Sequence, residues 1–246
     1  MALPSIVTPE YNTIIPSTEQ KITYRPFLVK QEKILLTAQE SDDPNDQTLA
    51  LANVLAECIT TADISVGGLT TFDIEYLFLK IRSKSVGENI TIKLGHQGTN
   101  SPSGTLENKC EYKTEISINI DEIAPPEIIT DKKIQLTDDV GVVIKYPTFQ
   151  DVIDNESSKE GTESIAFMFD MIANSIDYVY DGEDVYNEFS DEEMKDWIES
   201  LNQSQFEKIS NFFNTMPSLK HEVKWKCSKC GEEDTLLIEG LQNFFI

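Results

Sequence analysis

The chain has 246 residues, of which 39% are hydrophobic and 26% are charged, and its formal net charge is −23. This length and apolar content are typical of a soluble globular protein that can bury a core. The negative charge argues against binding to nucleic acid or to anionic membrane surfaces, because both are bound through lysine and arginine. It favours a protein partner that has a basic face.

The sequence predicts neither secretion nor a membrane span. The opening residues MALPSIVTPEYNTIIPS lack a basic region and a long apolar run, so we expect no signal peptide. No apolar run reaches the roughly 20 residues that cross a bilayer. Four cysteines are too few for a disulfide framework in a chain of this length, which indicates a reducing cytosol.

Short β-rich runs and helical patterns alternate in the N-terminal half. The runs YNTIIP and KITYRPFL, separated by STEQ, predict a β-hairpin. Helical patterns follow at 29–39 and again where Leu51, Leu55 and Cys58 share one face. A third helix is predicted to begin near Thr70, with Asp73 as its capping acid.

The apolar period then changes from 3.6 residues to two. Ile90, Ile92 and Leu94 alternate with polar residues, and a longer alternating run extends from Cys110 to Ile120. Both runs predict strands that bury one face. Two further β-like runs, KKIQL and GVVIKYP, follow them.

The segment 162–216 is predicted to be mainly helical. Its first helix has an apolar stripe that continues through Ile176 to Val179, and two later helices are expected behind capping boxes at Ser190 and Ser204. The last residues predict a β-hairpin around the CxxC sequence. We therefore expect an α+β fold with three regions that form one integrated unit. They are an α+β region at 1–147, a mainly helical region at 148–220, and a knuckle hairpin with an apolar tail at 221–246.

The sequence CSKCG at Cys227–Gly231 is the clearest chemical motif, and three interpretations of it stay open. It resembles one knuckle of a zinc ribbon, but zinc needs four ligands and the chain has no second CxxC. His221 lies too far along the same strand, which leaves Cys110 and His96 as the candidates to join Cys227 and Cys230. A redox pair is disfavoured because a strand, not a helix, follows the cysteines. The third interpretation is a turn whose thiols bind no metal of their own, or share zinc with another chain.

No sequence motif for catalysis is present. The chain contains no P-loop, no GxGxxG and no nucleophile motif, and its two histidines have no neighbouring triad partners. Carboxylate pairs carry no information in so acidic a chain. We therefore expect a protein without enzymatic activity and without a cofactor, with one structural zinc as the alternative.

Four stretches are informative in combination, and they occur in the order YRPFLVKQEKILL, FDIEYLFLKIRSKSVGE, SLNQSQFEKISNFFNTMP and KCSKCGEEDTLLIEGLQNFF. In this order they resemble the baseplate hub assembly proteins of T4-like contractile-tailed bacteriophages. The resemblance implies a non-enzymatic component or assembly factor of the tail baseplate hub, whose partners are other hub proteins. It also implies a place in the host cytoplasm during assembly, or in the virion baseplate. The alternative is an adaptor protein that binds partners through a zinc ribbon.

Two apolar stretches are the candidate contact surfaces for such partners. The run RPFLVK contributes Arg25 and Phe27, and the last residues contribute Phe244 and Phe245. Exposed aromatic side chains often anchor protein interfaces. An apolar segment near a frayed terminus is expected to dock, either on its own chain or on a partner.

Overall fold

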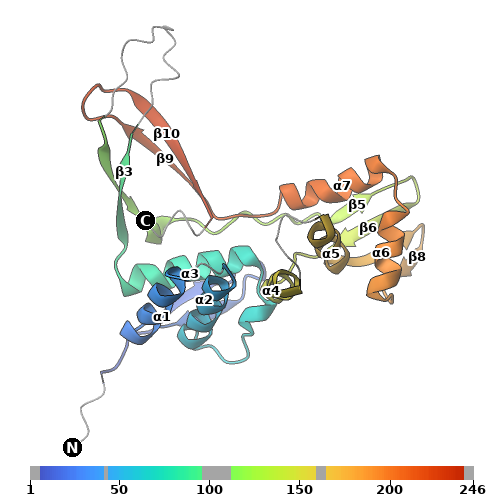
Figure 1. Cartoon of the computed structure of the whole chain (residues 1–246), viewed down its shortest axis with the longest axis horizontal. Coiled ribbons are helices and arrows are strands. Elements are labelled where there is room, and N and C mark those ends of the chain that lie inside the picture. Colours follow the sequence, from blue (N-terminus) through green and yellow to red (C-terminus); the bar gives the residue numbers. More distant parts are fainter. Residues whose placement is uncertain (1–5, 42–43, 96–111, 159–164, 241–246) are drawn as a thin grey trace, which may run out of the picture.

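The computed structural model describes residues 6–41, 44–95, 112–158 and 165–240, and it confirms the predicted α+β fold class. Helices and small antiparallel sheets form two lobes that lie side by side (Figure 1). Within the described residues, every helix is too short or too polar to cross a membrane.

The first lobe combines a hairpin with three helices. The hairpin pairs β1 (Tyr11–Ile14) with β2 (Lys21–Tyr24), and the helices are α1 (Val29–Gln39), α2 (Pro44–Cys58) and α3 (Thr71–Ser85). These elements were expected from the sequence at nearly the same positions. α1 and α2 pack against each other, and α2 packs on α3. Nine of the 15 residues of α3 are buried, so α3 is the central helix of the lobe's core.

The start of α3 is fixed by a buried capping box. Thr70 Oγ1 accepts the Asp73 N–H at 3.3 Å, and Asp73 Oδ2 accepts the Thr70 N–H at 3.1 Å. The predicted stripe of Ile74, Leu77, Phe78 and Ile81 is buried to within 1% exposure. Sequence periodicity and capping chemistry therefore agree along this helix.

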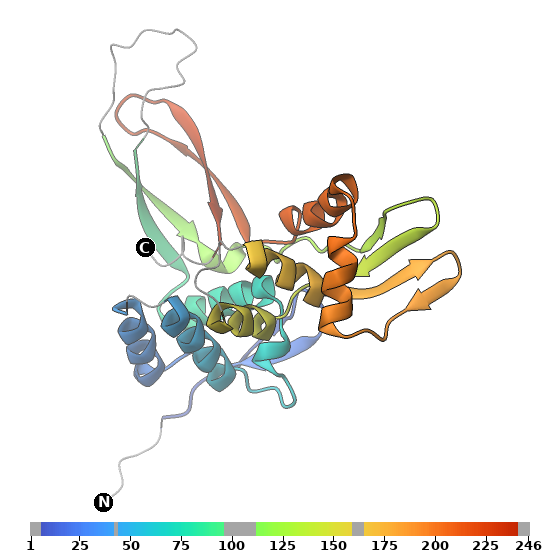
Figure 2. The same ribbon diagram turned by 45° about the vertical axis from the view of Figure 1, so that its right-hand side comes forward.

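Two β-hairpins project together from the end of α3. One pairs β3 (Asn89–Leu94) with β4 (Thr114–Asn119), and the other pairs β9 (Lys220–Lys226) with β10 (Glu233–Glu239). We call these four strands the hairpin arm. Figures 1 and 2 show the two hairpins side by side, and β4 contacts β9. The predicted alternation is confirmed where Ile90, Ile92 and Ile118 are buried. The described part of the second strand is shorter than the predicted run from Cys110 to Ile120, because Tyr112 lies outside β4 and is 46% exposed, and Ile120 begins a 3₁₀ turn. Cys110 lies outside the described residues.

The second lobe is an antiparallel sheet in the order β5-β6-β7-β8 packed against helices. Its strands are β5 (Lys133–Gln135), β6 (Val140–Ile144), β7 (Ile176–Asp181) and β8 (Asp184–Tyr186). Its helices are α5 (Ile165–Ser175), α6 (Asp191–Glu199) and α7 (Gln203–Asn214), while α4 (Phe149–Ser158) lies between the lobes and contacts both α2 and α5.

The prediction of a continuous helix through Val179 is wrong, because the chain changes from α5 to β7 at Ile176. The register of β7 on β6 shifts at this point: Val143 pairs with Tyr178, but Ile144 pairs with Ile176. Asp177 is therefore an extra residue, as in a β-bulge, and it puts Ile176 and Val179 on the same buried face. Their spacing of three residues imitates a helical stripe.

The predicted second capping box is also wrong by two residues. Asn202 Oδ1 accepts the Gln205 N–H at 3.0 Å, and Gln205 Oε1 accepts the Asn202 N–H at 2.9 Å, so α7 begins behind Asn202 and not behind Ser204. An asparagine is as good an N-cap as a serine. The first box is confirmed, since Ser190 caps α6 together with Glu193.

The buried side chains form two clusters that meet at α3. The first cluster draws on residues from Ile15 to Ile123 and also on Leu219, Val223 and Ile238 from the C-terminal part of the chain. The second cluster lies between the β5–β8 sheet and its helices. Phe72 of α3 belongs to the second cluster and meets Tyr146 edge to face, with ring centroids 5.1 Å apart. The region boundaries at 147 and 220 stay a prediction.

Candidate functional site: the cysteine knuckle and exposed apolar surfaces

The cysteine motif forms the tight turn between β9 and β10. Cys227 N–H donates to Glu232 O at 2.8 Å, and Gly231 N–H donates to Cys227 O at 2.9 Å. Gly231 has a φ of +77°, a left-handed conformation that glycine adopts without steric cost. These two backbone hydrogen bonds close the hairpin at the CSKCG sequence.

The two thiols of the knuckle have different environments. Cys227 is 1% exposed, Cys230 is exposed, and neither forms a disulfide. Ser228 between them attaches the knuckle to β4, because its N–H donates to Thr114 Oγ1 at 3.1 Å. Burial of Cys227 thus follows from docking of the turn against the other hairpin of the arm.

The structure leaves the zinc prediction untested. In the described part of the chain, no three histidine, cysteine or acidic side chains are grouped so that they could hold a metal ion. His96 and Cys110, the predicted additional ligands of Cys227 and Cys230, lie outside the described residues. β9 runs unbroken from Lys220 to Lys226, so His221 and Cys227 are held apart as the strand argument predicts.

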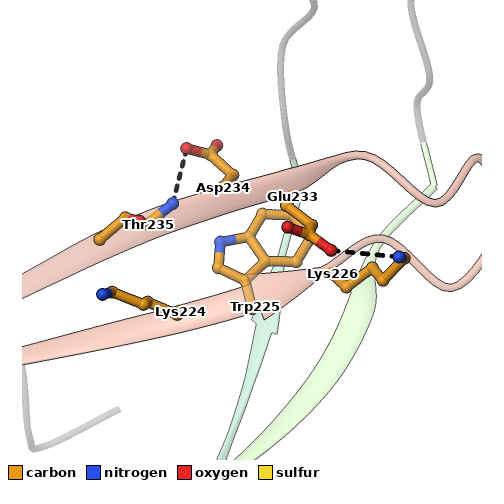
Figure 3. A pocket seen from close by; sticks show the side chains of 6 residues that line it. All are labelled: Lys224, Trp225, Lys226, Glu233, Asp234 and Thr235. Atoms are coloured by element: carbon orange, nitrogen blue, oxygen red, sulfur yellow. Dashed lines mark hydrogen bonds and ion pairs between the residues drawn. The ribbon is translucent and has the colours of Figure 1, made fainter.

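A shallow depression lies beside the knuckle on the same hairpin (Figure 3). It is bounded by Lys224, Trp225, Lys226, Glu233, Asp234 and Thr235. Lys226 Nζ lies 3.1 Å from Glu233 Oε1, and Asp234 Oδ1 accepts the Thr235 N–H at 2.8 Å. Trp225 is 7% exposed and offers little ring surface. These contacts stabilise the hairpin surface and do not form a site for a small ligand.

The predicted contact residues Arg25 and Phe27 are engaged within the first lobe. Arg25 N–H donates to Cys58 O at 2.9 Å, and its guanidinium donates to Pro26 O at 3.2 Å. Phe27 is half-buried and stacks on Phe78 with ring centroids 6.5 Å apart. Both side chains therefore help to hold the chain between β2 and α1. Phe244 and Phe245 lie outside the described residues.

The residues directly after Phe27 are more exposed. Gln31, which is 2% exposed, accepts the Leu28 N–H at 2.9 Å and donates to Glu57 Oε2 at 2.6 Å, so the start of α1 is held against the end of α2. This arrangement leaves Leu28 48% exposed and Val29 80% exposed. Sequence reasoning missed both residues, although the RPFLVK stretch contains them.

A signal for this surface was present in the sequence. Val29 and Leu36 are seven residues apart and share a face of α1, while Ile34 and Leu35 pack against the first cluster from another face. Leu36 is 55% exposed. A helix with apolar residues on two faces indicates that one of them is directed to solvent or to a partner. We call Leu28, Val29 and Leu36 the α1 apolar surface.

A charged cluster at the end of α3 has a structural role. Lys84 Nζ of α3 lies 2.8 Å from Asp121 Oδ2 in the 3₁₀ turn Ile120–Glu122, and Ser83 Oγ donates to Asp121 Oδ1 at 3.1 Å. Burial raises the pKa of the Asp121 carboxyl, but the hydrogen bonds from Lys84 and Ser83 outweigh burial and hold that pKa below its usual value. The cluster joins the end of α3 to the base of the hairpin arm.

Comparison with known proteins identifies the class of the chain. A family model described as T4 bacteriophage base plate protein matches residues 8–246, and the chain belongs to this family. No curated protein and no solved structure matches the chain. The chain is therefore a protein of the phage tail baseplate, from a family that is typically structural and non-enzymatic, and family membership implies binding to other baseplate proteins.

Proposed function

We propose that this chain is a component or assembly factor of the baseplate hub, which acts without catalysis by binding other hub proteins. The observation that carries the baseplate role is the extent of the family match, which includes both buried clusters and the hairpin arm. The whole fold, and not an appended segment, is thus the unit that belongs to the baseplate. The hub assignment rests on the resemblance of the four sequence stretches to hub assembly proteins. The protein then acts in the host cytoplasm during assembly, and a structural subunit would remain in the virion baseplate.

Measurement of copy number tests this proposal. Deletion of the gene should stop baseplate assembly, and quantitative mass spectrometry of purified virions should give either a fixed copy number or none. A fixed number that agrees with tail symmetry identifies a structural subunit, and absence from the particle identifies an assembly factor. Normal baseplates after deletion would contradict both forms of the proposal.

We assign partner binding in the first lobe to the α1 apolar surface, together with Arg25 and Phe27 beside it. Val29→Glu should reduce co-purification with hub proteins by about tenfold, because a charge would be desolvated in the interface. Its melting temperature should stay close to that of the original chain, since Val29 is 80% exposed. Val86→Glu is the matched control, because Val86 is also exposed, at 61%, and caps the end of α3. Equal binding of the two variants to hub proteins would exclude the α1 apolar surface as the partner-binding surface.

A zinc-dependent adaptor is the second candidate function, and the knuckle geometry favours it. The CxxC spacing is that of a pair of zinc ligands. The left-handed Gly231 and its hydrogen bond to Cys227 fold the residues between the two cysteines into a tight turn. Cys227, Cys230, Cys110 and His96 are the proposed ligands. Metal analysis of the purified chain should then find one zinc, and Cys230→Ser should lower the melting temperature. Zinc far below one per chain, with an unchanged melting temperature, would exclude this candidate.

A further inference from the structure

The two edges of the β5–β8 sheet are protected very differently. At the β5 edge, Lys208 Nζ of α7 donates to Gln135 O at 3.0 Å and to Leu136 O at 3.2 Å. Lys133 of the same strand places its ammonium 4.1 Å from the Tyr180 ring centroid. Lysine side chains that occupy edge carbonyls are a common protection against pairing with another chain. The β5 edge is therefore protected against pairing with a strand of another chain.

Within the described part of the chain, β8 at the opposite edge has no lysine bonded to it in this way. It consists of Asp184, Val185 and Tyr186, all exposed, and among the described residues β7 is the one strand that pairs with it. Val185 is 56% exposed and Tyr186 is 54% exposed. Figure 2 shows the β7–β8 hairpin, in light orange, projecting at the free margin of the second lobe.

The register identifies which backbone groups face outward. Asp181 pairs with Asp184 across the two-residue turn at Gly182, where φ is +59°. The pair that flanks such a turn is hydrogen-bonded, and bonding alternates along an antiparallel ladder. Val185 therefore directs its N–H and C=O away from β7, toward the open edge.

The residues around this edge are almost all negatively charged. Between Asp177 and Glu199 the chain has ten acidic residues, all exposed, and one lysine. That lysine, Lys195, is itself paired with Asp170 at 2.8 Å. An added strand would meet a strongly negative field along its whole length, and this field selects positive side chains.

We propose that β8 is the docking edge for a basic, extended segment of another baseplate protein, which adds to the sheet as a fifth strand. The inference rests on the proposed function, because it assumes a baseplate partner. Main-chain hydrogen bonds to Val185 fix the register, and Val185 and Tyr186 supply apolar contact area. A three-residue edge offers few hydrogen bonds, so attraction between opposite charges supplies much of the affinity.

A second copy of this chain does not suit the same edge. Two β8 strands placed side by side would bring the acidic residues around this edge, Asp184 among them, near those of the other copy. Like charges opposite each other destabilise strand pairs. The acidic rim thus disfavours self-association while it leaves the edge open to a cationic strand.

Photo-crosslinking from position 186 tests the proposal. Tyr186→benzoylphenylalanine, expressed during phage assembly, should crosslink to a segment of another baseplate protein that is rich in lysine or arginine. Three variants then separate edge pairing from general contact. Val185→Pro removes the outward N–H, and Val185→Lys introduces a lysine of the kind that protects sheet edges. Val185→Thr is the control, because it keeps both the N–H and a β-branched side chain.

The proline and lysine variants should reduce the crosslink at least about tenfold, and the threonine variant should stay within about twofold. Circular dichroism reports whether Val185→Pro folds. If it does not fold, the crosslink yield of Val185→Lys alone tests edge pairing. A crosslink to a second copy, to an acidic segment, or one that survives Val185→Lys would overturn the proposal. A complex with hub proteins that forms without any crosslink at position 186 would overturn the edge assignment alone, whereas absence of any complex would contradict the proposed function as well.

Discussion

Ser17, in the turn between β1 and β2, is bonded twice to the buried carboxylate of Asp73 at the start of α3. Its N–H donates to Asp73 Oδ1 at 2.8 Å, and its Oγ donates to Oδ2 at 2.6 Å. Asp73 is 0% exposed and also accepts the Thr70 N–H and hydroxyl. Four donors thus satisfy one buried negative charge, and they fix the N-terminal hairpin on the central helix.

Removal of this carboxylate should destabilise the first lobe strongly. Asp73→Ala leaves the buried donors of Thr70 and Ser17 without their acceptor, and we expect a loss of about 3 kcal/mol in the free energy of unfolding. Ser17→Ala removes one of the bonds and should cost about 1 kcal/mol. Urea denaturation measures both values. Thr18→Ala on the same turn is the control, because Thr18 is exposed and should change stability by less than about 0.5 kcal/mol.

The start of α7 can be tested by two single substitutions. Asn202→Ala removes the side chain that caps the helix, and it should lower the free energy of unfolding by about 1 kcal/mol. Ser204→Ala lies inside the first turn and should change it by less than about 0.5 kcal/mol. Chemical denaturation of both variants shows which substitution lowers the free energy of unfolding more. A larger effect of Ser204→Ala would place the cap where the sequence pattern had predicted it.

Acid should weaken the junction between α3 and the hairpin arm. The pKa of Asp121 is below its ordinary value of 3.8 in the folded chain, so the unfolded chain binds more protons in acid. The stabilisation that Asp121 contributes is complete above its ordinary pKa of 3.8. It is lost as the pH falls through the lower pKa that Asp121 has in the folded chain. Asp121→Asn should therefore cost about 1–2 kcal/mol near neutral pH, and the difference from the original chain should shrink below about pH 4. Urea denaturation across this pH range provides the measurement. A difference that does not change with pH would contradict the assigned role of Asp121.

The cysteines should differ widely in reactivity. Burial raises the pKa of the Cys58 thiol to about 11, and Cys58 is 0% exposed. Iodoacetamide should therefore label exposed Cys230 first in the native chain, while Cys58 and Cys227 should react only after unfolding. Peptide mass spectrometry gives the order. Slow labelling of Cys230 that a zinc chelator accelerates would support the adaptor candidate, and rapid labelling of Cys58 would contradict the structure.

The helix α3 shows what the sequence can specify. Its capping residues and its apolar stripe are local signals that agree, so its start and its buried face were both predictable. At β7 the local signals conflict with the fold, because the bulge at Asp177 gives a strand the spacing of a helix. At α7, Asn202 and Ser204 both fit the capping pattern, so the local sequence does not distinguish them, and the structure has Asn202 as the cap.

The candidate surfaces were less predictable than the fold. Phe27 and Val29 are both apolar, but Phe27 stacks on Phe78, whereas Val29 is 80% exposed because α1 packs on α2 with a different face. Neither contact can be read from local spacing. The docking of β9–β10 against β4 likewise depends on residues about a hundred positions apart, such as Thr114 and Ser228.

This distant docking also has a consequence for synthesis on the ribosome. The first cluster gains most of its members by Ile123, but Leu219, Val223 and Ile238 are translated about a hundred residues later. At roughly 5–20 residues per second, the nascent lobe spends about 5–20 s without its last apolar contributors. The second cluster, whose other members fall between Leu136 and Phe212, can form during that interval. The first lobe therefore completes its buried cluster only near the end of synthesis, once the residues up to Ile238 have been made.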